Sequence, residues 1–434
     1  MSSPKIDAAR VEYVLDCHLR SQVPGAALAL THAGEPILTK CYGLADLARR
    51  QLVQPTTVFR LASLSKPFTA LVIMLLERDG LLDVDAPIRY YLPGYPAHAA
   101  RVTVQHLLTH TSGIPNCTGQ PGYVDIMSNS RRTDADLLAC FVEAGLDFEP
   151  GSRYGYSNSG YRLLDMIAEQ VTGMPFGTIV TERIFAPAGM HHSLLLNDTT
   201  NTSDLARGYT GSADSFGNAA YVNIALTGGA GGIGSTLEDL LRFDQALRTE
   251  SIADAALQRR LFSPTRLATG RAEGYGLGWK LGAYRGHGLI YHGGAIQGFT
   301  CLYLRLPDDD LGIILLTNLQ GFPARNIARR LIDTVLEQPP VERPLIPLPQ
   351  SAVDSRAGAY ANTDHRLDIT AELGHLIVSF LDRCHRMAPV DRTIYVAQDD
   401  PDITLTFHDG GPEAACTLHY PLWWCTAYRL VPDA

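Results

Sequence analysis

A cluster of prolines divides this chain into two parts. Five prolines fall within eleven residues: Pro339, Pro340, Pro344, Pro347 and Pro349. Proline fixes its own φ angle and has no backbone N–H to donate, so this run favours an extended connector over a helix or a central strand. The chain's 434 residues also exceed what one hydrophobic core usually organises. We therefore predict a large domain over residues 1–338, a linker over 339–349 and a small domain over 350–434.

The large domain carries strand signals at both ends and helical signals between them. A helix is expected over 6–21, followed by a hairpin of strands at 26–30 and 37–42. Helical patterns dominate from 63 to about 173, and a last helix is expected over 324–337. Strand patterns return at 276–280, 288–291, 299–305 and 312–317. This order predicts an α+β fold, in which an antiparallel sheet flanked by helices is completed by both ends of the domain and a helical cluster is inserted between them.

The small domain shows a different periodicity. Apolar residues alternate with other residues in two segments, 376–380 and 403–407. A period of two is typical of strands with one buried face. We therefore expect a small antiparallel β domain after the linker.

The charge pattern excludes one broad class of function. The formal net charge is −9, from 36 Lys and Arg against 45 Asp and Glu. No basic run is longer than a pair such as Arg131-Arg132, which argues against a nucleic-acid-binding protein. The longest apolar run, 68–76, is far shorter than the roughly 20 residues of a membrane span. We expect neither a nucleic acid nor a membrane as a partner.

The first residues and the cysteines bear on location and on metals. Residues 1–20 show no basic start followed by an apolar stretch of roughly 7–15 residues, so we expect a cytoplasmic protein. The cysteines form no C-x-x-C pair and no histidine-rich metal spacing, which indicates free buried thiols, although two disulfides stay open. The eight are Cys17, Cys41, Cys117, Cys140, Cys301, Cys384, Cys416 and Cys425.

A candidate nucleophile lies at the start of a predicted helix. Ser63-Leu64-Ser65-Lys66 fits the pattern S-x-x-K, and the spacing places Ser63 and Lys66 on one helical face. A serine hydroxyl is a poor nucleophile until a base takes its proton, and a lysine desolvated beside it can act as that base. The pattern is weak alone, because it also occurs at residues 2–5. The alternative is that Ser63 is an ordinary helix N-cap.

A second motif, Tyr-x-Asn, occurs three times, beginning at Tyr156, Tyr221 and Tyr360. Tyr156 follows a Pro-Gly turn and precedes a helical run, whereas Tyr221 lies in a Gly- and Ser-rich stretch and Tyr360 lies beyond the linker. We therefore select Tyr156, whose phenol can relay protons beside a lysine. Asn158 can then hydrogen-bond Lys66 and a substrate amide. The alternatives are a buried tyrosine and a turn asparagine.

The third element is a strand segment with a small residue, which allows a substrate backbone to approach. His292-Gly293-Gly294 is the best candidate. The segments that begin at Lys280 (Lys-Leu-Gly) and at His408 (His-Asp-Gly) compete with it. We rank Lys280 second because it ends a predicted strand one hairpin earlier. His292 could also be a polar edge residue with no catalytic part.

These motifs together carry a resemblance to a known family. Five ordered segments resemble the successive signatures of the serine β-lactamase and penicillin-binding protein superfamily: 59–66, 103–115, 150–160, 229–236 and 292–299. The resemblance covers about residues 5–338 and is closest to the group of class C β-lactamases, D-aminopeptidases and esterases. No G-x-S-x-G pattern occurs, which argues against an α/β-hydrolase.

The resemblance implies a role for each residue. Ser63 would be acylated, Lys66 and Tyr156 would share the general-base and general-acid work, and Asn158 would position the substrate. The backbone N–H groups of Ser63 and of Ala295, which follows the two glycines, would form the oxyanion hole. How Lys66 and Tyr156 divide the proton transfers stays open.

One departure from the family pattern affects the expected substrate. Class C β-lactamases usually carry Lys-Thr-Gly where this chain has His292, Gly293 and Gly294, and H-x-G is similar to D-aminopeptidases, D-amino-acid amidases and several esterases. A neutral imidazole attracts a substrate carboxylate less strongly than an ammonium does. We therefore expect neutral amides and esters to be preferred. We also expect carboxylate ligands to bind better near pH ~6.5, where an unperturbed histidine begins to protonate.

The resulting functional hypothesis is a serine hydrolase that acts through an acyl-enzyme on a small amide, D-aminoacyl peptide or ester, without a metal or organic cofactor. The alternatives are a carboxylesterase, a β-lactamase or DD-peptidase, and a penicillin-binding sensor that does not turn over. The β domain resembles the lipocalin-like or barrel domains of D-aminopeptidase-type relatives, which can cover the cleft or mediate self-association, so a homo-oligomer stays open. Substrate identity resides in the segments 116–132 and 197–228, which have no readable code.

Overall fold

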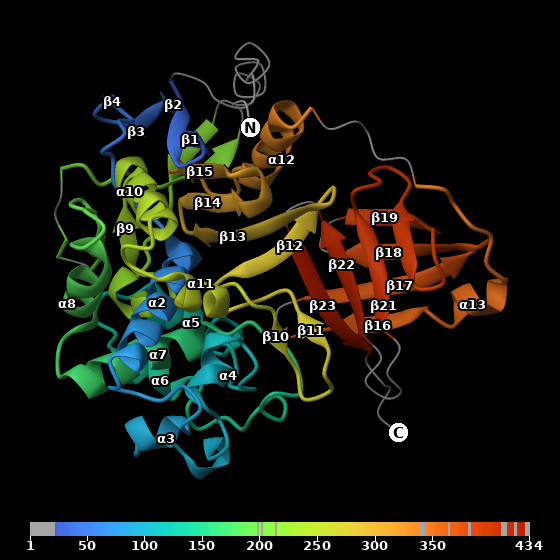
Figure 1. Ribbon diagram of the computed structural model, residues 1–434, viewed down its shortest axis with the longest axis horizontal. Coiled ribbons are helices and arrows are strands. Elements are labelled where there is room, and N and C mark those ends of the chain that lie inside the picture. The colour runs from blue at the N-terminus through green and yellow to red at the C-terminus, as the bar shows by residue number, and fades with distance from the viewer. Residues whose placement is uncertain are drawn as a thin grey trace. The chain divides into compact units, whose positions relative to one another are not determined.

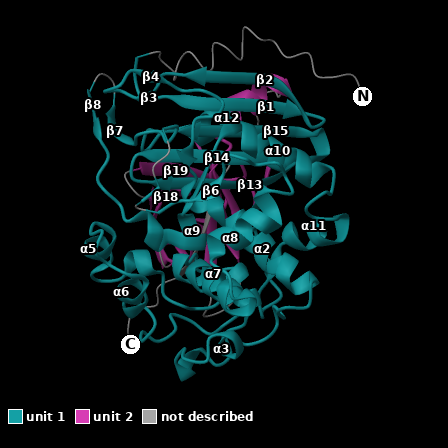
Figure 2. Cartoon of the chain, turned by 90° about the vertical axis from the view of Figure 1, so that its left-hand side faces the viewer, with its two compact units in different colours: residues 1–3, 7–281, 287–328 teal, residues 4–6, 282–286, 329–434 magenta. Residues whose placement is uncertain are grey.

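The computed structural model describes residues 22–429 apart from 198, 201–202, 213–214, 338–342, 363–364, 381–382, 409–414 and 421–422. The described residues form two compact units (Figure 2). Unit 1 contains the residues up to Leu281 together with His287–Ala328, and unit 2 contains Gly282–Gly286 and the residues from Arg329 onward. The division falls inside a helix, so the predicted domain limits at 338 and 350 stay a prediction. The helix expected over 6–21 lies outside the described residues.

A six-stranded sheet forms the centre of unit 1, in the order β12-β13-β14-β15-β1-β2 (Figure 1). The pairs β1–β2, β1–β15, β13–β14 and β14–β15 are antiparallel. Strands from the start of the chain therefore complete a sheet built from its later part, which confirms the predicted α+β class. The bounds are β1 Ala26–His32, β2 Glu35–Tyr42, β12 Lys280–Tyr284, β13 His287–Ile296, β14 Phe299–Leu306 and β15 Leu311–Thr317.

The burial of each strand follows from its place in this sheet. All seven residues of β15 are buried, and β1 is buried over six of seven, as expected for continuous apolar strands covered on both faces. Strand β2, at an edge, is mostly exposed or half-buried. Helix α10 (Leu237–Arg248) packs on β1 and β15.

One predicted strand of this sheet is wrong in position. Residues 276–280 were expected to be a strand, but the chain bends before Lys280, where β12 begins. Gly278 adopts a φ of 79°, which L side chains rarely adopt, and a Cβ there would lie 2.7 Å from the Ala70 Cβ on helix α2 (Lys66–Arg78). The glycine therefore turns the chain against α2 and makes Lys280 the first residue of the strand.

The inserted helical cluster packs around α2, which contacts α7, α8 and α9. Helix α7 begins after Ser157, whose Oγ accepts a hydrogen bond from the Gly160 N–H, and ends at Gly173 with a φ of 70°. Within the described residues, no helix has the length and apolar character needed to cross a membrane. The further helices are α3 Ile88–Tyr91, α4 Val104–Leu108, α5 Tyr123–Met127, α6 Asp134–Ala139, α7 Asn158–Thr172, α8 Phe176–Val180, α9 Gly228–Gly231, α11 Ala255–Leu261, α12 Ala324–Val335 and α13 Gln350–Asp354.

Short strands complete unit 1 around the helices. Two of them, β5 and β6, pair with β9, so segments far apart in sequence meet beside the start of α2. The bounds are β3 Leu44–Asp46, β4 Gln51–Leu52, β5 Phe59–Arg60, β6 Leu194–Leu195, β7 Tyr209–Ser212, β8 Ser215–Asn218, β9 Ile233–Ser235, β10 Thr265–Arg266 and β11 Ala272–Glu273.

Eight antiparallel strands of unit 2 close on themselves as a barrel, β16 to β23, which confirms the predicted all-β C-terminal region. Leu367 and Ile369 on β17, and Leu376 and Val378 on β18, are buried in the barrel core. The bounds are β16 Gly358–Ala361, β17 Arg366–Glu372, β18 His375–Phe380, β19 Arg383–Pro389, β20 Ile394–Ala397, β21 Thr404–His408, β22 Ala415–Tyr420 and β23 Trp423–Arg429.

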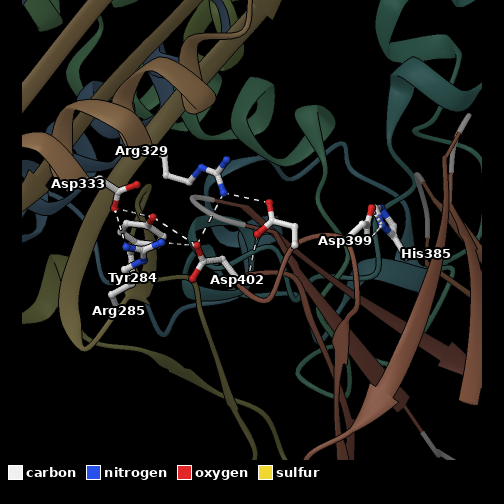
Figure 3. A network of polar contacts seen from close by, with 8 residues as sticks. Tyr284, Arg285, Arg329, Asp333, His385, Asp399 and Asp402 are labelled. Carbon is white, nitrogen blue, oxygen red and sulfur yellow. Dashed lines mark hydrogen bonds and ion pairs between the residues drawn. The ribbon is translucent and has the colours of Figure 1, made fainter. Parts of the chain in front are cut away.

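A polar network within unit 2 joins the residues 282–286 to the barrel (Figure 3). Arg285 donates to Asp402 at 2.9 Å, and Arg329 on α12 donates to Asp400 at 2.9 Å. The Asp402 side chain is only 7% exposed and also lies 3.7 Å from Arg329. One barrel loop thus neutralises two arginines that come from separate segments.

Candidate active site

Ser63 lies in a short 3-10 helix, Ala62–Ser65, that runs directly into α2 at Lys66. In a 3-10 helix, residues i and i+3 eclipse each other, so Ser63 and Lys66 project from the same side. Ala62 adopts a φ of 48°, a left-handed conformation that costs energy for a residue with a Cβ. The Leu61 N–H donates to the Ile233 carbonyl at 2.9 Å and pins the turn to β9.

The Lys66 side chain is fully buried, and its Nζ meets three oxygens. It lies 3.3 Å from the Ser63 Oγ, 2.7 Å from the Asn158 Oδ1 and 2.8 Å from the Ala230 carbonyl oxygen. The Asn158 amide is oriented by Asn116, whose Oδ1 accepts from both the Asn158 N–H and its Nδ2. The orientation of Asn158 is therefore imposed from outside the Ser63–Lys66 pair.

Tyr156 is the copy of the Tyr-x-Asn motif that the structure brings to Lys66. The Lys66 Nζ lies 4.8 Å from the centroid of its ring. Tyr221 is 48% exposed, and Tyr360 belongs to the core of the barrel. Lys280, at the start of β12, also faces Tyr156, with its Nζ 5.9 Å from the ring centroid. His408, the other competing position, donates to or accepts from Thr417 in the barrel.

A chain of hydrogen bonds lies behind Tyr156. The Ser157 N–H donates to the His110 Nδ1 at 3.1 Å, so a neutral His110 carries its proton on Nε2 and donates it to the Tyr275 hydroxyl at 3.2 Å. The Tyr275 hydroxyl is 3.3 Å from the His292 Nε2, and the His292 Nδ1 is 2.7 Å from the Gly293 carbonyl. The carbonyl can only accept, so Nδ1 carries the His292 proton and Nε2 accepts from Tyr275.

Burial keeps the two histidines of this hydrogen-bonded chain, His110 and His292, neutral. His110 and His292 are each 1% exposed, and burial, reinforced by the charges of Lys66 and Lys280, holds both pKa values well below 6.5. The expectation that His292 begins to protonate near pH 6.5 is therefore wrong. Both ring nitrogens of His292 already have hydrogen-bond partners within the protein. The geometry therefore does not favour His292 as a direct contact for a substrate carboxylate.

Ser63 and Ala295 line one cavity of about 150 Å³, together with Asn158. Apolar side chains, including Leu137 and Leu226, complete its wall. Ser63 and Ala295, whose N–H groups are the predicted oxyanion hole, thus lie at one cavity although they are 232 positions apart in the sequence.

The two glycines before Ala295 differ in what they allow. A Cβ on Gly294 would lie 2.0 Å from the Leu61 carbonyl oxygen, whereas a Cβ on Gly293 would meet nothing closer than 3.3 Å. The Cys301 thiol also donates to the Leu61 carbonyl at 2.9 Å. Gly294 therefore lets the turn that carries Ser63 pack against β13.

Sequence reasoning gave no role to four participants: His110, Tyr275, Asn116 and the Ala230 carbonyl. His110 lies in the segment 103–115 that carried the resemblance, and its membership of that segment was a usable signal. Tyr275 shows no such local signal, because only the fold brings it between two histidines. A backbone carbonyl is invisible to a side-chain pattern.

Comparison with known proteins identifies the family. Residues 9–337 match the family described as Beta-lactamase. The chain belongs to the beta-lactamase family. Among curated relatives of this beta-lactamase family member, "Penicillin-binding protein 4*" of Bacillus subtilis is 33% identical over 315 residues, covering 69% of each chain. "D-aminopeptidase" of Brucella suis is 29% identical over 378 residues, covering 85% of this chain and 70% of the relative.

Solved structures agree with the fold. The octameric penicillin-binding protein homologue from Pyrococcus abyssi has a TM-score of 0.67 at 23% identity and covers 98% of this chain and 99% of its own. The D-amino acid amidase from Ochrobactrum anthropi has a TM-score of 0.64 at 28% identity, over 76% of this chain and 97% of its own. These similarities support a hydrolase of the beta-lactamase family.

Proposed function

We propose that this chain is a serine hydrolase that forms an acyl-enzyme at Ser63 on a small D-aminoacyl amide or peptide. The observation that carries the proposal is the position of the buried Lys66 Nζ, 3.3 Å from the Ser63 Oγ and held there by two further oxygens. A nucleophile within hydrogen-bond reach of a base that a third group orients is the arrangement that activates a hydroxyl.

The acceptors around Lys66 determine which proton can move. An ammonium has three N–H donors, one for each oxygen that Nζ meets, whereas a neutral amine has two N–H donors and one lone pair. The Ala230 carbonyl and the Asn158 Oδ1 can only accept, so they take the two remaining N–H groups. The lone pair of a neutral Lys66 is then left for the Ser63 hydroxyl, the one neighbour of the three that can donate. A neutral Lys66 would therefore draw its proton from Ser63.

The other site residues take the remaining steps of an acyl transfer. As the Ser63 Oγ attacks the substrate carbonyl, the negative charge that develops on its oxygen would be stabilised by the N–H groups of Ser63 and Ala295. The amine that leaves needs a proton, which the Tyr156 hydroxyl would deliver and recover through Lys66. Water would then hydrolyse the ester on Ser63, with the same groups acting in reverse.

The relatives favour a D-aminoacyl substrate. A D-aminopeptidase covers 85% of this chain, and a D-amino acid amidase is similar over 76% of it. The cavity beside Ser63 is small and partly apolar, which suits a compact acyl group. A carboxylesterase is the second candidate, because the same machinery cleaves esters. A β-lactamase or DD-peptidase, and a sensor that is acylated without turnover, remain as outcomes of the test.

The test combines labelling with turnover. A fluorophosphonate probe should modify the protein once, and peptide mapping should place the label on Ser63. The protein should hydrolyse D-aminoacyl anilides faster than their L-isomers, short acyl esters or a cephalosporin. A label on Ser65 or Ser235 with Ser63 unmodified would overturn the nucleophile. A stoichiometric burst without further turnover would indicate the sensor, and faster ester or cephalosporin cleavage would replace the substrate class.

A further inference from the structure

Lysine is rare in this chain, and half of the lysines face one tyrosine ring. Of 36 basic residues only four are lysines, Lys5, Lys40, Lys66 and Lys280. The Nζ atoms of Lys66 and Lys280 lie 4.8 and 5.9 Å from the centroid of the Tyr156 ring. Lys66 is accounted for by its contacts with Ser63, but Lys280 has no part in the steps described so far.

Lys280 lies where its hairpin partner β13 continues past the start of β12. It is the first residue of β12, which contains five residues, whereas its hairpin partner β13 contains ten. The second half of β13 therefore runs past the start of β12, and this half contains the segment from His292 to Ala295. Because β14 pairs with the other edge of that segment, the edge beyond Lys280 is the one to which an extended substrate can add.

The positive charge around Tyr156 and His292 comes from lysine side chains and not from histidine. Burial keeps His110 and His292 neutral, and the charges that act on the pKa of His292 are foremost those of Lys280 and Lys66. Lys66 is fully buried against Ser63, Asn158 and Ala230, while Lys280 is half-buried. Lys280 is therefore the cation that an entering ligand can reach, and its charge acts across the site whichever hydrogen bonds its Nζ makes.

In the proposed reaction the leaving group lies beside Tyr156, and therefore near the charge of Lys280. The atom that leaves takes its proton from the Tyr156 hydroxyl in the proposed reaction, so the substituents on that atom lie around Tyr156. In a peptide with a free carboxyl terminus, the carboxylate is two bonds away from the leaving nitrogen. We propose that Lys280 is a specificity-determining residue that attracts an anionic carboxylate on the leaving side of the substrate. This inference rests on the proposed function, and it replaces the expectation of a site that prefers neutral leaving groups.

The test compares two substrates that differ only in charge, D-Phe-D-Ala and its carboxamide D-Phe-D-Ala-NH₂. Lys280→Met should lower kcat/KM for the free carboxylate relative to the carboxamide by about tenfold, as expected for the loss of a unit charge near a protein surface. Lys280→Arg should keep most of the preference, and high salt should weaken it in the unmutated protein. Lys40→Met, on the opposite edge strand β2 of the same sheet, is the matched control and should change nothing.

Binding separates this inference from the proposed reaction. In a Ser63→Ala background, which cannot form the acyl-enzyme, calorimetry should show tighter binding of D-Phe-D-Ala than of its carboxamide, and Lys280→Met should remove the difference. This result would support Lys280 even if the unmutated protein cleaved neither dipeptide, an outcome that would overturn the substrate class alone. An unchanged ratio of the two ligands in Lys280→Met, or an equal loss for both, would overturn the role of Lys280.

Discussion

Lys66 and Tyr156 are the residues on which the proposed chemistry depends most. We expect Lys66→Ala and Tyr156→Phe each to lower kcat by about 10²–10⁴, the usual effect of losing a general acid or base. The measurement is steady-state turnover of a D-aminoacyl anilide, with circular dichroism to verify the fold. Tyr221→Phe and Tyr360→Phe are the controls, because those tyrosines lie on the surface and in the barrel core. A control that loses as much activity as Tyr156→Phe would show that the wrong copy of the motif was selected.

The buried histidines make stability depend on pH. An unfolded histidine titrates near pH ~6.5, whereas burial lowers the pKa of folded His110 and His292 well below that value. Below pH ~6.5 the unfolded chain therefore binds more protons than the folded one, and their contribution to the free energy of unfolding is lost as the pH falls. The loss is up to about 1.4 kcal/mol per pH unit for each histidine.

Denaturant unfolding between pH 7 and pH 5 measures this dependence. His292→Gln, which cannot be protonated, should give a shallower decline than the unmutated protein. His98→Gln, on an exposed position, should leave the slope as it is. Equal slopes for the unmutated protein and His292→Gln would contradict the assignment of a neutral buried imidazole.

At the scale of elements, the site depends on how closely the turn at Ser63 packs on β13. Gly294→Ala would place a Cβ 2.0 Å from the Leu61 carbonyl oxygen, so either the turn or the strand must move. We expect a loss of about 1–3 kcal/mol in the free energy of unfolding, the usual cost of overpacking. Activity should fall as well, because Ser63 and Ala295 line the same cavity.

Gly293→Ala is the matched control for this change. Its Cβ would come no closer than 3.3 Å to the Cys301 carbonyl oxygen, a contact that a small shift relieves. Thermal unfolding and kcat/KM should therefore change less than in Gly294→Ala. If the two variants behaved alike, close packing of the turn would not be what Gly294 provides.

At the scale of the whole molecule, each unit has its own hydrophobic core, and ion pairs also stabilise unit 2. The Asp402 carboxylate lies 2.9 Å from Arg285 and 3.7 Å from Arg329 and is nearly buried. Asp402→Ala would remove this partner from Arg285 and Arg329. We expect the free energy of unfolding of unit 2 to fall by about 1–3 kcal/mol. Hydrogen exchange of the amides in β17 and β18 would report it.

The control for Asp402 is an ion pair in solvent. Asp368 pairs with Arg366 at 2.8 Å, and both side chains are more than half exposed. Solvent screens such exposed pairs and they stabilise a fold little, so Asp368→Ala should leave the exchange nearly unchanged. Faster exchange in Asp368→Ala than in Asp402→Ala would show that burial does not determine how much an ion pair stabilises unit 2.

Local sequence patterns determined much of this protein. Alternation at 376–380 and 403–407 predicted two strands of the barrel, continuous apolar runs predicted β1 and β15, and the order of the motifs predicted the family. These features report on periodicity and turn chemistry, which act over a few residues. The same reasoning placed a strand at 276–280 wrongly, because the bend at Gly278 is imposed by α2, which is far away in the sequence.

Only the tertiary structure decided which side chains meet. His110 and Tyr275 are 165 positions apart, and Lys66 and Ala230 are 164 positions apart, so no local pattern relates them. The sequence ranked His292 and Lys280 as competitors for one role, whereas the fold places a charged Lys280 beside the Tyr156 ring and a neutral His292 against Tyr275. That difference arises because burial removes water from an imidazole and disfavours its charged form, and burial is a property of the packed molecule and not of the residue.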